Sequence, residues 1–292
     1  MDKARLLTAG TLVAGPTAAG PREKQAGFVA AQLRHIDAYC LVKTGGLLRQ
    51  IWKARRVRDI DPPTLQPEPE LSPTAMLDSQ GHGARDWSDA IPTSAHAVIW
   101  AEAGAGKTLC LLREVQDLNL AYLESLHATT PQGYTPALYL HAQELTQELL
   151  RQPDCAAAIA TLALRRIPEW AADQTLRDWL MRSIYEGRIC LAVDGLDEVS
   201  VGAVAGAGGA PVSPRRLLAS ALQTLVAQAQ PCRLLLSSRF DSTIARMFSI
   251  SHAEHYALAP FRAEQVLQDL KRADVAFAEI IAKENDLVSL LR

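Results

Sequence analysis

The stretch from Ala95 to Thr108, AHAVIWAEAGAGKT, constrains the fold of this chain more than any other. Its apolar run from Ala97 to Trp100 has the length of a buried strand. The AEAGAGKT that follows has the spacing of a phosphate-binding loop. Apolar side chains then recur at helical spacing in LCLLREVQDLNLAYLESL. A strand, a loop and a helix in this order predict the phosphate-binding unit of an α/β protein.

The residue types of this loop match the chemistry of phosphate binding. Gly104 and Gly106 allow a tight turn that aims backbone N–H groups at phosphate oxygens. Lys107 supplies a point charge for the β- and γ-phosphates, and the Thr108 hydroxyl is a ligand for Mg²⁺. Ala101 stands where a glycine is usual, which costs about 1 kcal/mol only if its φ is positive. The predicted nucleotide contacts are Ala103, Gly104, Ala105, Gly106, Lys107, Thr108 and Leu109.

A second motif, ICLAVDGLDEV, spans residues 189–199. Its apolar part reads as a buried parallel strand that ends in Asp194, at the sheet edge where α/β proteins bind ligands. Asp194 therefore fits the Walker B position and, with Thr108, forms the predicted metal site. Asp197 and Glu198 follow within one turn, and one of them is expected to orient or deprotonate an attacking water. The alternative is a solvated acidic turn after the strand, and it is less favoured because the sequence also contains a phosphate-binding loop.

A third motif, CRLLLSSRF, spans residues 232–240. Leu234 to Leu236 form another buried strand, so Ser238 and Arg239 are expected at the same sheet edge. An arginine there can sense the γ-phosphate, because its positive guanidinium would contact the negative phosphate group that is lost on hydrolysis. The alternative is an ordinary surface arginine. The predicted catalytic group consists of Asp197, Glu198 and Arg239.

Composition excludes several classes of protein. The 292 residues carry a net charge of −2, which argues against a nucleic-acid binder. The five cysteines are scattered without a CxxC pair and read as buried thiols of a reducing compartment. No apolar run reaches the length of a membrane span. The expected location is therefore cytoplasmic, with a signal peptide at the weakly apolar N-terminus as the less favoured alternative.

The chain divides into four predicted parts. The basic stretch KARRVRD, residues 53–59, reads as the solvated end of a helix rather than a nucleic-acid or membrane patch. Further strands are expected at ALYLH and near residues 255–258, and a Gly- and Ala-rich insertion with little order at residues 201–214. The predicted parts are a helical N-terminal region of unknown role (1–60), a Pro-rich linker (61–91), a nucleotide-binding domain (92–262) and the start of a helical subdomain (263–292).

The series AEAGAGKT, PALYL, AVDGLDE, LLLSSRF and ALAPFRAEQ resembles the NACHT ATPase module of the STAND class of signal-transduction NTPases. The DGLDE box is its most specific part, and the resemblance covers Ala95 to Arg292. It implies a three-layer P-loop NTPase sandwich with a five-stranded parallel sheet in the order 5-1-4-3-2. Ala101 and Ala103 replace the usual Gly and Pro of GEPGAGKT. The winged-helix region of the family is absent from these residues, so the chain reads as a fragment or a truncated member.

The resemblance implies an ATP-binding switch that hydrolyses slowly and whose oligomerisation depends on the bound nucleotide. ATP or GTP and Mg²⁺ are the expected cofactors, and self-association or an effector or sensor protein the expected partners. Nucleic acid and stable membrane insertion are not expected. Two alternatives stay open: an interaction module that binds nucleotide without hydrolysis, and a P-loop kinase, which the DGLDE and Ser-Arg motifs disfavour.

Overall fold

A computed structural model describes residues 20–44, 56–60, 85–91, 95–127, 135–205, 211–228 and 230–259. The helices of these ranges are α2 (Pro21–Thr44), α5 (Trp87–Ala90), α6 (Lys107–His127), α7 (Ala142–Arg151), α8 (Cys155–Arg165), α9 (Gln174–Tyr185), α10 (Pro214–Val226), α11 (Ser242–Met247) and the 3-10 turns Pro168–Trp170 and Leu196–Glu198. The strands are β1 (Arg56–Asp59), β2 (Arg85–Asp86), β3 (His96–Trp100), β4 (Ala137–His141), β5 (Cys190–Asp194), β6 (Val204–Ala205), β7 (Pro211–Val212), β8 (Arg233–Ser238) and β9 (Ala253–Leu258).

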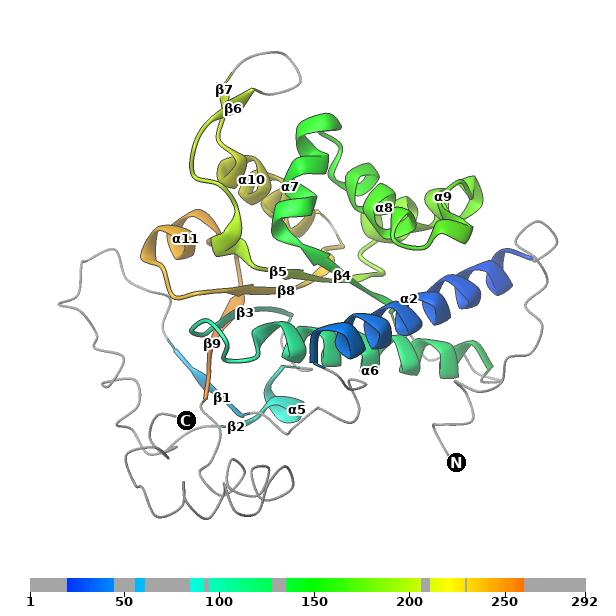
Figure 1. The fold of residues 1–292 in the computed structure, drawn as a ribbon, viewed down its shortest axis with the longest axis horizontal. Coiled ribbons are helices and arrows are strands. Elements are labelled where there is room, and N and C mark those ends of the chain that lie inside the picture. Colours follow the sequence, from blue (N-terminus) through cyan, green and yellow to red (C-terminus); the bar gives the residue numbers. More distant parts are fainter. Residues whose placement is uncertain are drawn as a thin grey trace.

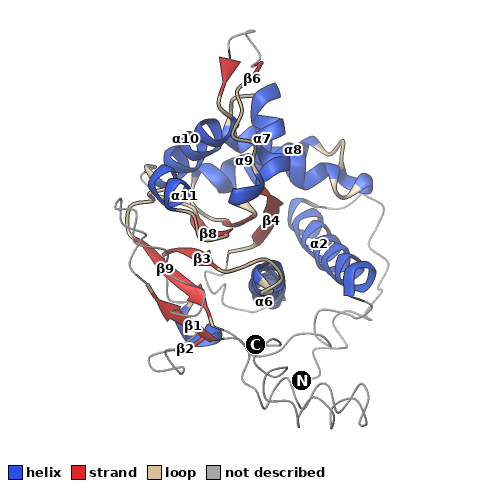
Figure 2. Ribbon diagram, turned by 60° about the vertical axis from the view of Figure 1, so that its left-hand side comes forward, coloured by secondary structure: helices blue, strands red, loops and turns tan. Residues whose placement is uncertain are grey.

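A seven-stranded sheet in the order β2-β1-β9-β3-β8-β5-β4 forms the centre of the molecule (Figure 1). The pairs from β9 to β4 are parallel, whereas β1 pairs antiparallel with both β2 and β9. Helices α7 to α11 cover one face of the sheet, and α6 covers the other with α2 beside it (Figure 2). The chain is therefore an α/β protein with a three-layer arrangement.

The parallel strands form where the sequence has short apolar runs. All residues of β3 and β5 are buried, as expected of strands that helices cover on both faces. Successive side chains of β3 alternate between the two faces, so Ala97 and Ile99 join the apolar cluster around α6. Val98 and Trp100 join the larger cluster beneath α7 to α10. Two apolar cores thus hold the strands in place, and their carboxyl ends meet at one edge.

The prediction of a five-stranded parallel sheet was wrong in strand count and therefore in the order of the whole sheet. The five parallel strands adjoin one another as β9-β3-β8-β5-β4, but β1 and β2 extend the sheet beyond β9. β1 comprises Arg56–Asp59, which the sequence placed at a solvated helix end. It is a strand because its backbone pairs with β9, with Val57 opposite Leu258, and Val57 is fully buried.

Several local predictions agree with the structure, and others concern residues that the structure does not describe. Helix α9 spans Gln174–Tyr185, and α2 supplies a helix in the N-terminal region. β2 and α5 lie within residues 85–90 of the predicted linker. The insertion of residues 201–214 contains the short antiparallel pair β6-β7, which its composition did not indicate. The predicted helical subdomain at 263–292 and any signal peptide within residues 1–19 lie outside the described residues, and the division into domains stays a prediction.

No helix in the described part of the chain is both long and apolar enough to cross a membrane.

Gly187 ends the turn after α9, and a side chain there is expected to destabilise the fold. Its φ is 64°, and an added Cβ would lie 2.5 Å from the Gln230 carbonyl oxygen. Gly187→Ala should therefore lower the free energy of unfolding by about 2 kcal/mol or more. The alanine would have to adopt a left-handed backbone conformation, and its Cβ would clash with the backbone at Gln230. Thermal unfolding should show a drop of several degrees. Gly202→Ala, where the nearest atom is 3.9 Å away, is the control; equal melting temperatures for both variants would contradict this prediction.

Candidate functional site

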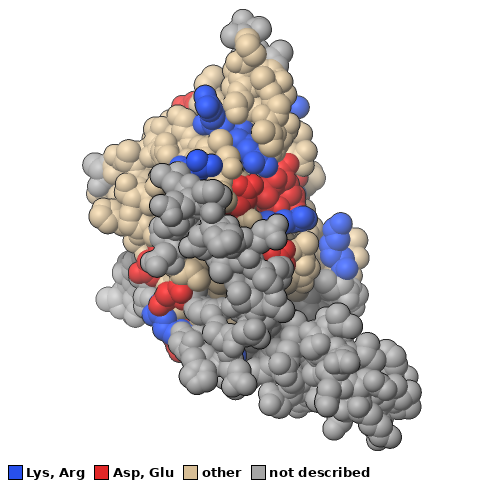
Figure 3. Space-filling model, turned by 90° about the vertical axis from the view of Figure 1, so that its left-hand side faces the viewer, with Lys and Arg blue, Asp and Glu red and all other residues tan. Residues whose placement is uncertain are grey.

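Three predicted motifs meet at the carboxyl edge of the sheet, on the left of Figure 1. Trp100 at the end of β3 lies opposite Ser238 of β8, and Val193 of β5 lies opposite Leu236. The register therefore brings the loop after β3, Asp194 and Arg239 to one place. Figure 3 views the molecule from this side and shows acidic side chains next to basic ones.

The loop between β3 and α6 has the conformation that its glycines predict. Gly104 and Gly106 have φ values of 76° and 90°, which favour glycine. The Lys107 ammonium donates to the carbonyl oxygens of Ala101 at 2.6 Å and Glu102 at 3.0 Å, so the side chain folds back along its own loop. Within the described residues, the backbone N–H groups of Gly106, Lys107 and Thr108 make no hydrogen bond. Such groups at the start of a long helix suit an anion.

Burial affects the charge of Lys107. Desolvation lowers the pKa of its ammonium below the ordinary value, and the carboxylates of Asp197 and Asp194 act in the opposite direction. An anion beside the ammonium would favour the charged form and raise this pKa. The site therefore holds a partly desolvated cation that a phosphate group would stabilise.

Asp194 is a buried carboxylate surrounded by hydroxyl donors. Its Oδ2 accepts hydrogen bonds from Thr108 Oγ1 at 2.6 Å and from the Tyr139 hydroxyl at 2.9 Å, while Oδ1 accepts one from Ser237. No ion pair with Asp194 occurs among the residues that the structure describes. Thr108 and Asp194, the predicted metal ligands, are thus in direct contact. Tyr139 and Ser237 were not predicted.

Gly195 shapes the acidic turn that follows Asp194. It is left-handed, with φ 77°, and an added Cβ would lie 3.1 Å from the Glu198 side chain. The turn continues as the 3-10 helix Leu196–Glu198. From the first turn of α10, Arg215 donates to the carbonyl oxygens of Val199 at 2.8 Å and Asp197 at 3.0 Å. The backbone that carries the two acidic side chains is therefore held by Gly195, which is part of the motif, and by Arg215, which lies outside it.

Asp197 and Arg239 form an ion pair across the carboxyl edge. Arg239 Nε lies 3.2 Å from Asp197 Oδ2, and the Arg239 backbone N–H donates to Oδ1 at 3.0 Å. The Arg239 side chain is 57% exposed, whereas that of Asp197 is 16% exposed. Glu198 is exposed to solvent. The two neighbouring acids thus differ: Asp197 is engaged by Arg239, and Glu198 is accessible.

A cavity of about 250 Å³ lies between these groups. It brings together nearly all of the predicted site residues, with Gly195 in addition, whereas Ala105 is not part of its wall. Ala105 instead has its backbone N–H directed to the Glu102 carbonyl at 3.3 Å. The wall consists of Ala103, Gly104, Gly106, Lys107, Thr108, Leu109, Asp194, Gly195, Asp197, Glu198 and Arg239.

The oxygen donors of the cavity fit Mg²⁺. Thr108 and Asp194 offer a hydroxyl and a carboxylate, and Mg²⁺ usually combines one or two such ligands with phosphate and water. The described residues contain no cluster of three or more His, Cys, Asp or Glu side chains that could hold a metal alone. A metal at this site would therefore depend on phosphate oxygens and water for most of its ligands.

Comparison with known proteins adds no family assignment. No protein-family model matches the sequence, and no curated protein matches it.

Proposed function

We propose that this chain is an ATP-binding, slowly hydrolysing signal-transduction switch module of the NACHT type. The observation that carries the proposal is the cavity at the carboxyl edge. There a glycine-rich loop and its lysine lie beside a threonine–aspartate pair, an accessible glutamate and an arginine. The chemistry of this set suits a polyphosphate: free N–H groups and an ammonium for the oxygens, and carboxylate and hydroxyl for a cation.

Mg²⁺ would be held by Thr108 and Asp194, and when bound it neutralises charge on the phosphates. The three hydroxyl groups around Asp194 orient the carboxylate before a cation arrives. Asp194 is buried and forms no ion pair with a residue of the described ranges, so a cation at the cavity would be its direct counter-charge. This arrangement supports a nucleotide site whose affinity depends on Mg²⁺.

For hydrolysis, Glu198 is the better candidate for orienting water. Its side chain is accessible and borders the cavity, whereas the carboxylate of Asp197 is engaged by Arg239 and by the Arg239 backbone. A water that donates a hydrogen bond to Glu198 would lose a proton to this carboxylate while its oxygen bonds to the γ-phosphorus. The bond between the γ-phosphorus and the bridging oxygen breaks, and ADP leaves with that oxygen. Asp197 instead positions Arg239.

The ion pair between Asp197 and Arg239 suggests how the site would distinguish nucleotides. A γ-phosphate competes with Asp197 for the guanidinium, whereas ADP leaves the ion pair intact. The Arg239 side chain is 57% exposed, so its guanidinium can turn from Asp197 to a phosphate while remaining solvated. Release of Asp197 would change the acidic turn, which is the proposed signal for self-association or for binding an effector.

Single-turnover hydrolysis tests the enzymatic part of the proposal. We expect Glu198→Gln to slow release of phosphate from prebound ATP by about 100-fold, the contribution typical of a general base. Glu102→Gln, in the same loop but outside the cavity wall, should leave the rate unchanged. If wild type binds ATP but releases no phosphate, the chain is instead an interaction module without hydrolysis.

Arg239→Ala is expected to reduce the preference for ATP over ADP. A charge-assisted contact to the γ-phosphate contributes about 1.5–3 kcal/mol, so ATP affinity should fall roughly tenfold or more. Affinity for ADP should stay almost unchanged, and so should the melting temperature without nucleotide. Titration of both nucleotides checks this, with the exposed Arg246→Ala of α11 as the control. Equal losses for ATP and ADP would exclude the sensor role.

A further inference from the structure

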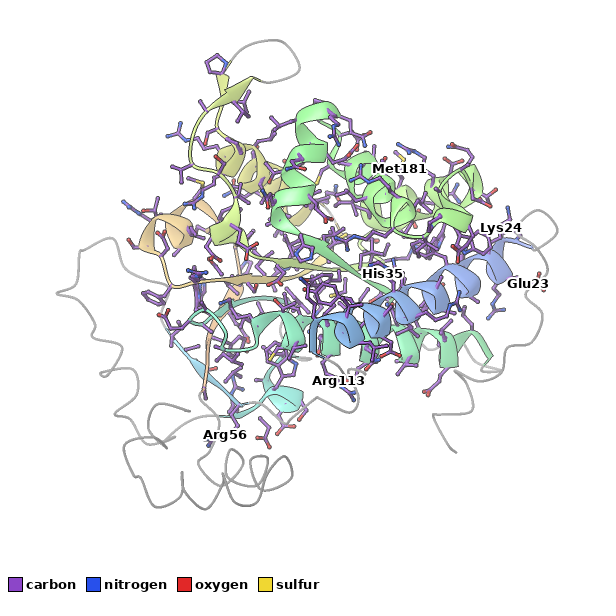
Figure 4. The ribbon with its side chains drawn as sticks, in the orientation of Figure 1. Glu23, Lys24, His35, Arg56, Arg113 and Met181 are labelled. Atoms are coloured by element: carbon purple, nitrogen blue, oxygen red, sulfur yellow. The ribbon has the colours of Figure 1, made fainter. Side chains whose placement is uncertain are left out.

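A second cavity lies between α2 and the edge strand β4, away from the loop that follows β3. It measures about 270 Å³ and is bordered by side chains from α2, α6, β4, α7 and the end of α8. Ile36, Leu112, Val115, Leu138 and Ile167 give it an apolar floor. Figure 4 shows His35 in the space between α2 and α8, at this cavity. None of the sequence motifs accounts for it.

Helix α2 presents a row of hydrogen-bonding groups to the cavity. Gln32, His35 and Tyr39 all border it and lie three and four residues apart, which places them on one helix face. Within the described part of the chain, none of these three side chains makes a hydrogen bond. A helix face with three free polar groups above an apolar floor suits a molecule with one polar and one apolar side.

The charged groups of the cavity cancel. Arg166 donates to Glu144 and to the backbone carbonyl of Tyr139, so its charge is matched by an adjacent carboxylate. Desolvation and then the nearby Arg166 lower the pKa of His35, which favours its uncharged form, whereas the carboxylate of Glu144 acts in the opposite direction. Among the described residues that border the cavity, a charged occupant would therefore find no unpaired counter-charge.

Aromatic and imidazole rings border the same space. The Tyr139 and His141 rings meet edge to face with centroids 5.1 Å apart, and Tyr39 lies 6.5 Å from His141. Such rings favour a flat aromatic partner. The volume falls just below the range of about 300–1,000 Å³ that is usual for pockets of drug-sized molecules, so the partner must be small.

We propose that this cavity binds an uncharged heteroaromatic molecule of one or two rings, with the polar groups of α2 bonding its edge. The occupant would contact Tyr139, whose hydroxyl donates to Asp194 at 2.9 Å. A single side chain therefore joins this cavity to the carboxylate of the phosphate site. Binding that shifts Tyr139 alters the hydrogen bonding of Asp194; this second part rests on the proposed function.

Titration with benzimidazole, which has two fused rings and is uncharged at neutral pH, tests the binding. We expect saturable binding by NMR with a Kd of about 1 mM or tighter, as a small ligand of good efficiency reaches. The double variant Gln32→Ala/Tyr39→Phe should weaken it at least fivefold. Arg34→Ala, an exposed neighbour on α2 outside the cavity, should not change it. Because Gln32 and Tyr39 are only partly buried, these changes should spare the fold.

Absence of saturable binding to the wild type, or equal affinity in the double variant and Arg34→Ala, would overturn the proposal. The coupling is measured separately, as the change in Mg²⁺-dependent ATP affinity at saturating benzimidazole. We expect a change of about threefold or more in wild type and none in Tyr139→Phe. If benzimidazole binds but ATP does not, the cavity proposal stands and the proposed nucleotide function fails. An equal change in both proteins would overturn the role of Tyr139.

Discussion

Replacing Lys107 by alanine is expected to abolish measurable ATP binding. Among the described residues, Lys107 is the only lysine that borders the cavity, and its two hydrogen bonds to the carbonyl groups of Ala101 and Glu102 also fix the loop's shape. Charge-assisted contacts to phosphate contribute about 1.5–3 kcal/mol each, so two of them correspond to a loss of more than 100-fold. Calorimetric titration of both proteins with MgATP measures the difference.

A control must separate loss of the ammonium from damage to the loop. Glu102→Gln changes a charge in the same loop at an exposed position, and it should retain wild-type affinity. Thermal unfolding without nucleotide should give similar melting temperatures for the three proteins. Equal ATP affinity in wild type and Lys107→Ala would remove the assignment of this loop as the phosphate site.

Asp194→Asn is expected to remove most of the dependence of ATP binding on Mg²⁺. The amide has the size of the carboxylate, and the hydroxyl groups of Thr108, Tyr139 and Ser237 can each rotate to accept as well as donate. The fold should therefore persist while the charge is lost. We expect ATP affinity in Mg²⁺ to fall at least tenfold, as the loss of about 1.5–3 kcal/mol implies, with little change in EDTA.

The comparison of the two solutions decides the role of Asp194. A loss confined to Mg²⁺ supports a metal ligand. The same loss in Mg²⁺ and in EDTA would mean that the carboxylate acts only through its hydrogen bonds to the surrounding strands. Ser237→Ala, which removes one donor but keeps the charge, should retain most of the Mg²⁺ effect.

The parallel strands could be predicted because each one is a short apolar run that ends in polar residues. β3, β5 and β8 are buried along almost their whole length, so hydrophobicity alone marks them. β1 and β2 carry no such signal. The four residues RVRD form a strand only because the edge of β9 offers backbone partners, and the dipeptide Arg85–Asp86 does so only because β1 then offers its own; both are tertiary effects.

The candidate site was predicted to the extent that its residues are neighbours in the sequence. The loop and the DGLDE turn each supply contiguous groups, and the meeting of the strand ends follows from the parallel sheet. Tyr139 and Ser237 could not be found in that way, because each comes from a different strand and reaches Asp194 only through the sheet register. A tyrosine near the end of the strand beside β5 was the available signal.

The cavity at α2 and the ion pair of Asp197 with Arg239 could not be predicted from the sequence either, because both depend on contacts between distant parts of the chain. The partners of a helix are set by packing. α2 packs against α6 and α9 and shares a cavity with β4 and the end of α8, and nothing in its own sequence indicates these neighbours. The acids Asp197 and Glu198 look equivalent in the motif. Both border the cavity, and only the structure shows that Asp197 pairs with Arg239 whereas Glu198 is exposed to solvent.

Calorimetric titration of the wild-type chain with ATP in the presence of Mg²⁺ tests the proposed nucleotide site most directly. We predict saturable binding of one ATP per chain, weakened by EDTA and displaced competitively by ADP. Absence of saturable binding would contradict the proposed function, and binding that neither Lys107→Ala nor EDTA weakens would place the nucleotide elsewhere on the molecule.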